Sequence, residues 1–130
     1  MVSLLLVEDN AYVTSALDGL LGTFDDMILG AVAPTGEEAL DMLPGLSVDL
    51  ALVDLALPGM SGIEFIVAAR KARPELPCII LSAHREESYV KQALSAGARG
   101  YITKELPLAI MEGIERVLAG EIYLSEDLRE

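Results

Sequence analysis

The stretch VSLLLVEDNAYVTSALDGLLGTF, residues 2–24, decides the fold because it holds one complete strand-and-helix unit. Its first part, residues 2–7, is almost continuously apolar, as strands of a parallel sheet are when both faces are buried. Its second part repeats apolar residues at helical spacing: Val13, Leu17, Leu20, Leu21 and Phe24. The stretch therefore predicts a buried strand that leads directly into an amphipathic helix.

Four more units of this kind follow along the chain. The other apolar runs are residues 27–32, 50–53, 78–81 and 100–102. Helical spacing follows them at residues 37–43, 63–67, 90–97 and 110–118. Such alternation predicts a parallel sheet with right-handed crossovers and helices on both faces. With five strands it favours a flavodoxin-like (βα)5 fold, an α/β doubly wound five-stranded parallel sheet in strand order 2-1-3-4-5.

Composition and charge limit what the chain can do. Its 130 residues fit one domain, and 52% hydrophobic content is enough for a core. No apolar run reaches the roughly 18 residues of a membrane span, and the first ten residues lack signal-peptide features, so we expect no membrane association. One cysteine excludes a disulfide framework and favours the cytoplasm. The net charge of −12 repels phosphate backbones, so we expect no nucleic acid to be bound by this domain itself.

Acidic residues follow two strands that are neighbours in the predicted order. Glu8 and Asp9 follow the first strand, and Asp54 follows the third. Ligands of such sheets bind outside the carboxyl ends of the strands where the strand order reverses, which here is between these two strands. Strands lie about 4.8 Å apart, so the carboxylates would repel one another without a cation. An all-oxygen site suits Mg²⁺.

Two more polar side chains end the remaining strands. Ser82 follows the fourth strand and Lys104 the fifth, so both side chains are expected near Asp54. Carboxylates, a hard cation, a hydroxyl and an ammonium group together indicate a phosphoryl-binding centre. The chain has no GxxxxGK[ST] motif, so the phosphoryl group does not arrive on a nucleotide held by such a loop. Asp54, on the central strand, is the best candidate to accept it covalently.

Four segments resemble the receiver domains of two-component response regulators. They are LLLVEDN (residues 4–10), LVDLALPGMSG (52–62), IILSAH (79–84) and GYITKE (100–105), in the family's order and at the family's strand ends. The resemblance covers essentially the whole chain. It implies a phosphoryl transfer from a sensor histidine kinase to Asp54, followed by slow self-catalysed hydrolysis. Such a domain is a switch rather than a turnover enzyme.

The resemblance also implies roles for the surrounding residues. Asp9 would bind Mg²⁺ directly and Glu8 through water, together with Asp54 and the backbone carbonyl of Ala56. Ser82 would close on the phosphoryl group, Lys104 would pair with it, and Tyr101 would swing inward. The added charge would then bias the surface formed by the fourth helix, fifth strand and fifth helix.

The residues around and after Lys104 narrow the resemblance to one subgroup of the family. Glu105 replaces the proline that follows this lysine in many receivers, and together with residues 117–127 it is similar to the NarL/FixJ subgroup, of the LuxR type. We therefore predict a receiver domain at residues 1–120 and the start of a linker at 121–130. A LuxR-type helix-turn-helix domain absent from this chain would bind DNA and regulate transcription. Homodimerisation on phosphorylation, through the first and fifth helices or the fourth, is a further hypothesis.

Other interpretations of the same residues remain open. The alternatives are a stand-alone receiver and an interaction module that is never phosphorylated. A haloacid-dehalogenase-like phosphatase needs an aspartate two residues after its nucleophile, where this chain has Ala56. Simpler roles also exist for single residues: Asp9 or Asn10 as a helix cap, Ser82 as a loop hydroxyl, Lys104 as a solvated lysine, Tyr101 as an edge-strand tyrosine, His84 as an exposed residue and Cys78 as a core residue.

Overall fold

The structure, a computed structural model, describes residues 1–104 and 107–128. Within these ranges the strands are β1 (Val2–Val7), β2 (Met27–Ala33), β3 (Leu50–Asp54), β4 (Cys78–Ser82), β5 (Gly100–Thr103) and β6 (Tyr123–Leu124). The helices are α1 (Ala11–Leu21), α2 (Gly36–Met42), α3 (Gly62–Ala72), α4 (Glu87–Ala96) and α5 (Pro107–Leu118). Short 3-10 turns cover Leu43–Gly45 and Glu126–Leu128.

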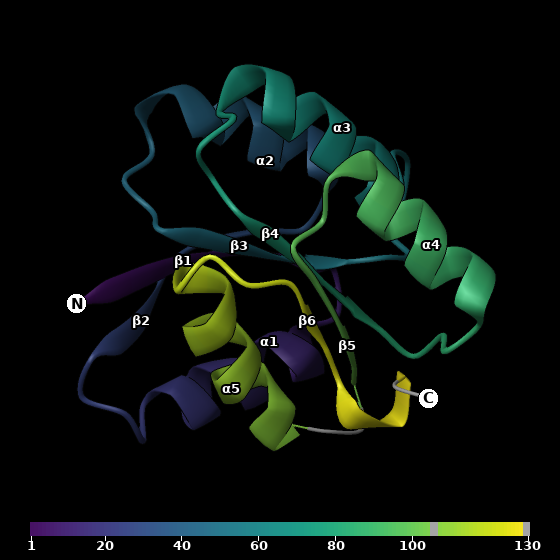
Figure 1. Cartoon of the computed structure of the whole chain (residues 1–130). Coiled ribbons are helices and arrows are strands. Elements are labelled where there is room, and N and C mark those ends of the chain that lie inside the picture. The colour runs from purple at the N-terminus through teal and green to yellow at the C-terminus, as the bar shows by residue number, and fades with distance from the viewer. Residues whose placement is uncertain (105–106, 129–130) are drawn as a thin grey trace.

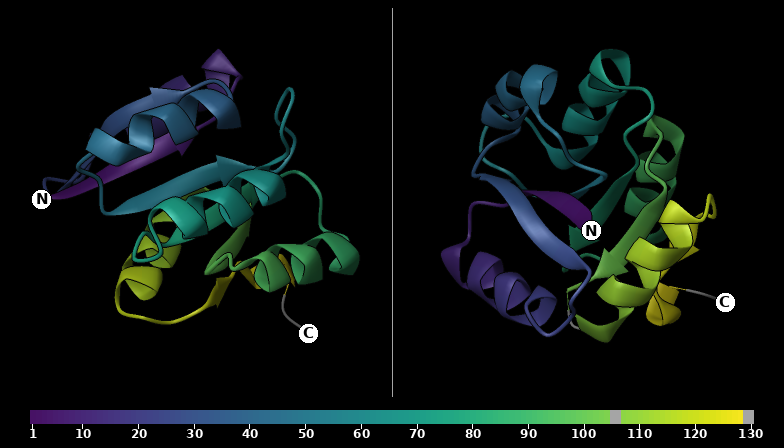
Figure 2. Two further views of the ribbon diagram at one scale, coloured as in Figure 1. Left: turned by 90° about the horizontal axis from the view of Figure 1, so that it is seen from above. Right: turned by 90° about the vertical axis from the view of Figure 1, so that its left-hand side faces the viewer.

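The strands form one parallel sheet between two layers of helices. Helices α2, α3 and α4 cover one face, while α1 and α5 cover the other (Figure 1). The two further views in Figure 2 place the same helices over the same faces. Two apolar clusters fill the space between helices and sheet, one on each side. The predicted doubly wound architecture is confirmed, as is the order of its first five strands.

The prediction of a five-stranded sheet was wrong, because the sheet has six strands in the order β2-β1-β3-β4-β5-β6. Strand β6 pairs with β5 in parallel, with Tyr123 opposite Gly100 and Leu124 opposite Tyr101. The physical reason lies in the backbone groups on the outer edge of β5, which need partners when they are buried. The N–H of Tyr123 donates to the carbonyl of Arg99 at 3.0 Å, and the N–H of Ser125 to that of Tyr101 at 3.0 Å.

Local signals fix where the helices next to the site begin. The side chain of Asn10 accepts hydrogen bonds from the N–H groups of Tyr12 and Val13, so α1 starts just after the acidic pair. Ser61 and Glu64 form a reciprocal capping box that starts α3. Gly62 is required as the first residue of α3, because a Cβ atom there would lie against the carbonyl oxygen of Asp54. These starts hold the carboxyl ends of β1 and β3 in place.

Truncation of the Phe65 side chain should strongly lower the free energy of unfolding. This side chain of α3 is fully buried against the sheet. We expect Phe65→Ala to lower the free energy of unfolding by about 3–5 kcal/mol, because it removes buried apolar area and leaves a cavity. Val67→Ala on the same helix is the control, since the Val67 side chain is 43% exposed and its loss should change stability little. Urea unfolding of both variants checks the difference, and equal losses would contradict this account of the core.

Two further expectations concern the turn after β5 and the length of the helices. The turn at Glu105, which replaces the proline of many receivers, lies outside the described residues. Within the part of the chain that is described, every helix is too short or too polar to cross a membrane.

Candidate functional site

The predicted site residues lie together at the carboxyl ends of the strands. Glu8 follows β1, Asp54 ends β3 and Ser82 ends β4, and all three are buried. Lys104 follows β5 and brings its ammonium group back across the sheet edge. Parallel strands end at the same edge, which is why residues nearly a hundred positions apart meet here.

Three carboxylates form the acidic part of the site. Glu8, Asp9 and Asp54 each offer an oxygen, and these oxygens lie within 4.8 Å of one another. Backbone N–H groups fix two of the side chains: that of Asn10 donates to Glu8 Oε2 at 3.2 Å, and that of Ala56 donates to Asp54 Oδ1 at 3.3 Å. Asp9 is exposed, so the cluster opens to solvent on its side. An oxygen-only donor set with one open side fits a hydrated divalent cation such as Mg²⁺.

Lys104 supplies the positive charge of the site. Its Nζ lies 3.0 Å from Glu8 Oε1 and 3.3 Å from Asp54 Oδ1. Burial alone would lower the pKa of Lys104, but the hydrogen bond to Glu8 and the charges of both carboxylates outweigh it and raise that pKa. The lysine is therefore charged at neutral pH. Burial raises the pKa of Glu8, although the hydrogen bonds from Lys104 and Asn10 act in the opposite direction.

Ser82 and Tyr101 connect the site to the loop between β4 and α4, residues 83–86. Ser82 Oγ accepts a hydrogen bond from the N–H of His84 at 2.9 Å. The Tyr101 hydroxyl donates to the His84 carbonyl at 2.8 Å, and the whole Tyr101 residue is buried. Burial raises the pKa of Tyr101, so its hydroxyl stays protonated and remains a donor. This arrangement places the ring inside the protein rather than on the edge of the sheet in solvent.

The structure decides between several of the simpler roles predicted for single residues. Asn10 is the helix cap, while Asp9 belongs to the acidic cluster. His84 is exposed, as predicted, and its ring lies 5.0 Å from that of Tyr89. Cys78 is a core residue, and burial raises the pKa of its thiol to about 12, so it is not a nucleophile at neutral pH.

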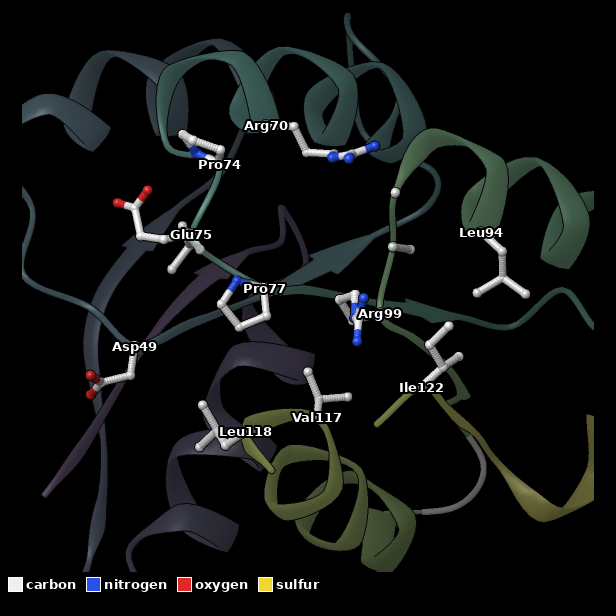
Figure 3. Close-up of a pocket in the computed structure, with 13 residues that line it drawn as sticks. Asp49, Arg70, Pro74, Glu75, Pro77, Leu94, Arg99, Val117, Leu118 and Ile122 are labelled. Atoms are coloured by element: carbon white, nitrogen blue, oxygen red, sulfur yellow. The ribbon is translucent and has the colours of Figure 1, made fainter. Parts of the chain in front are cut away.

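A hollow lies at the end of the sheet opposite the acidic cluster. Its volume is about 640 Å³, and Arg70 and Arg99 are among the residues that line it (Figure 3). Arg70 donates to the carbonyl of Ala96 at 3.3 Å, and Arg99 donates to that of Gly120 at 2.9 Å. Both arginines thus bind backbone carbonyls at or just after the ends of α4 and α5, which is a structural role. The acidic cluster, not this hollow, holds the reactive groups.

Sequence comparison identifies the family to which this fold and site belong. A profile of the response regulator receiver domain matches residues 4–115. The chain belongs to the response regulator receiver domain family. The receiver domain is 34% identical over 129 residues to the transcriptional regulatory protein UhpA of Salmonella typhimurium. It is 30% identical over 127 residues to the nitrate/nitrite response regulator protein NarL of Escherichia coli.

This chain aligns with only part of these two relatives but with nearly all of one solved structure. The alignments cover 98% and 97% of this receiver domain, but only 64% of UhpA and 59% of NarL. The receiver domain thus spans less than two thirds of either relative. A LuxR-family two-component response regulator from Aurantimonas sp. SI85-9A1 superposes with a TM-score of 0.93 at 29% identity, covering 97% of this chain and 91% of that one. The predicted similarity to NarL-type regulators is confirmed.

The sequence did not reveal two parts of the site. Nothing in the sequence pairs Lys104 with Glu8, since the two are 96 positions apart. The contact between the Tyr101 hydroxyl and the backbone of His84 was also missed, because every residue has a backbone carbonyl and the residue type does not show which one accepts. Position was the available signal for Glu8, His84 and Lys104, which follow the carboxyl ends of β1, β4 and β5.

Proposed function

We propose that this receiver domain accepts a phosphoryl group on Asp54 from a phosphohistidine of a sensor kinase, and that the new charge switches an output. The observation that carries the proposal is the position of the Asp54 carboxylate, 3.3 Å from Lys104 Nζ and within the three-carboxylate cluster. A nucleophile, a fixed cation and a set of metal-binding oxygens are the groups that phosphoryl transfer requires.

The surroundings favour Asp54 over the other two acids as the acceptor. Strand β3 lies between β1 and β4, so groups from both sides reach its carboxyl end. Glu8 has its two oxygens engaged by Lys104 and by the N–H of Asn10. Asp9 is exposed, where its carboxylate suits a hydrated cation. Asp54 is therefore the carboxylate best placed for attack on phosphorus.

The residues around Asp54 have separate roles in the phosphoryl transfer. A carboxylate oxygen of Asp54 attacks phosphorus, the new O–P bond forms as the N–P bond breaks, and the imidazole of the kinase leaves. Lys104 pairs with the phosphoryl oxygens, and the Ser82 hydroxyl donates a hydrogen bond to them. Glu8, Asp9, Asp54 and the carbonyl of Ala56 would hold Mg²⁺, which when bound neutralises charge on the phosphoryl group.

The relatives support a proposal about a longer protein that contains this domain. UhpA and NarL are regulators of about one and a half times this length. We infer that this receiver domain acts in the cytoplasm and controls a C-terminal helix-turn-helix domain that binds DNA, with residues 121–130 starting the linker. Homodimerisation on phosphorylation belongs to the same proposal.

Intact-mass spectrometry tests the proposal on the 130-residue chain. After incubation with acetyl phosphate and Mg²⁺ we expect one phosphoryl adduct, because the transfer needs only a small donor and the site. Chelation of Mg²⁺ should prevent it, since the three carboxylates then repel the incoming phosphoryl group. A chain that gains no phosphoryl group under either condition would contradict the proposed function and favour an interaction module.

A further inference from the structure

The described C-terminal residues are tied to β5 by side chains as well as by backbone pairing. We call residues 123–128 the clasp. Thr103 Oγ1 donates to Asp127 Oδ2 at 2.7 Å, Ser125 Oγ donates to Asp127 Oδ1 at 2.9 Å, and the N–H of Thr103 donates to Ser125 Oγ at 3.1 Å. Thr103 and Ser125 are fully buried. Figure 1 shows this segment in yellow alongside β5, leading to the C-terminus.

The clasp also contacts the loop that follows Ser82. Arg85 Nη1 lies 3.8 Å from Asp127 Oδ2. Tyr101 joins the same two parts, because its hydroxyl donates to the His84 carbonyl and its own carbonyl accepts from the N–H of Ser125. Burial alone would raise the pKa of Asp127, but the hydrogen bonds from Thr103 and Ser125 outweigh it and lower that pKa. The Asp127 carboxylate is therefore ionised at neutral pH and attracts Arg85.

We propose that the clasp is coupled to Asp54 through residues 83–86, and that phosphorylation of Asp54 loosens it. The proposal rests on the proposed function. In the order β3-β4-β5-β6, Asp54 lies on one side of β4 and the clasp lies on the other. When the Ser82 hydroxyl moves toward a phosphoryl group on Asp54, the loop of residues 83–86 moves with it. Arg85 then moves away from Asp127. The segment that leads to any following domain then loses one of its contacts.

The size of the coupling follows from the contact that is lost. The Arg85 and Asp127 side chains are 61% and 23% exposed. A pair this exposed changes an equilibrium constant by about twofold to fivefold. By thermodynamic linkage the effect is mutual, so a loosened clasp favours the phosphorylated state by the same factor.

Hydrogen exchange tests the coupling, with intact mass measured on the same samples. The N–H groups of Ser125 and Leu128 are hydrogen-bonded, so their exchange reports the clasp. After acetyl phosphate and Mg²⁺ we expect exchange over residues 123–128 to become about twofold to fivefold faster. Arg85→Ala should remove the response to phosphorylation while still gaining the adduct. Glu126→Gln, which changes a neighbouring acid, should keep the response.

The outcomes separate this proposal from the one on which it rests. An adduct with unchanged exchange at residues 123–128 overturns the coupling and leaves the proposed function standing. A full response in Arg85→Ala also overturns it. No adduct in the unmodified chain overturns both. Asp127→Asn provides a second check, because it should speed exchange in the unphosphorylated chain and reduce the further change on phosphorylation.

Discussion

Asp54→Asn should abolish the phosphoryl adduct while leaving the fold intact. The amide has nearly the same shape as the carboxylate but cannot form an acyl phosphate, so the adduct should fall below detection. Lys104 keeps Glu8 as a partner at 3.0 Å, so the substitution leaves no buried cation unpaired. Intact mass after acetyl phosphate and Mg²⁺ measures the effect, with thermal unfolding as the check on folding.

Asp49→Asn is the matched control for this substitution. Asp49 comes just before the amino end of β3, whereas Asp54 lies at the carboxyl end of that strand. The Asp49 side chain is exposed. Its side chain accepts from the N–H of Ser3 at 2.8 Å, a bond that an asparagine oxygen also accepts. The control should gain the adduct at the normal rate. An adduct that persists in Asp54→Asn would mean that another carboxylate, Glu8 or Asp9, is the acceptor.

Lys104→Met should destabilise the metal-free domain by about 1–3 kcal/mol at neutral pH. The substitution keeps an unbranched side chain but removes the ammonium group between Glu8 and Asp54, which leaves buried carboxylates without their cation. Because a divalent cation would neutralise the same charges, added Mg²⁺ should restore part of the loss. Urea unfolding with and without Mg²⁺ measures both effects, and acetyl phosphate labelling should be slower.

Two further variants make the Lys104 result specific. Lys91→Met removes an exposed lysine that pairs with Glu87 at 2.8 Å, and it should change the free energy of unfolding little, because water and salt screen a pair at the surface. Adding Glu8→Gln to Lys104→Met should recover stability, because it removes the buried charge that the lysine had balanced. If Lys104→Met costs no more than Lys91→Met, the lysine does not stabilise the acidic cluster.

Most of the fold was predictable because buried parallel strands and amphipathic helices have different periods. Each of the first five strands begins at the predicted residue, and each ends at most one residue beyond the prediction. Strand β6 was not predictable in this way, because two residues show no period. Its position depends on backbone groups at the outer edge of β5 that would lack partners without it, and sequence patterns do not display such groups.

The site was predictable in composition but not in its contacts. Topology alone brings Glu8, Asp54 and Ser82 to one edge, so their positions after apolar runs were sufficient. The ion pair between Lys104 and Glu8 depends on the reach and direction of one long side chain. The bonds from Thr103 and Ser125 to Asp127 depend on β6, so a polar segment that resembles a linker gave no indication of them.

Chemical trapping of the phosphorylated residue tests the central claim most directly. After labelling with acetyl phosphate and Mg²⁺, borohydride reduces an acyl phosphate to an alcohol, which marks the acceptor for peptide mass spectrometry. We predict a homoserine at position 54 and at no other position. Reduction at Glu8 or Asp9, or an adduct that borohydride does not reduce, would contradict the assignment of Asp54 as the phosphoryl acceptor.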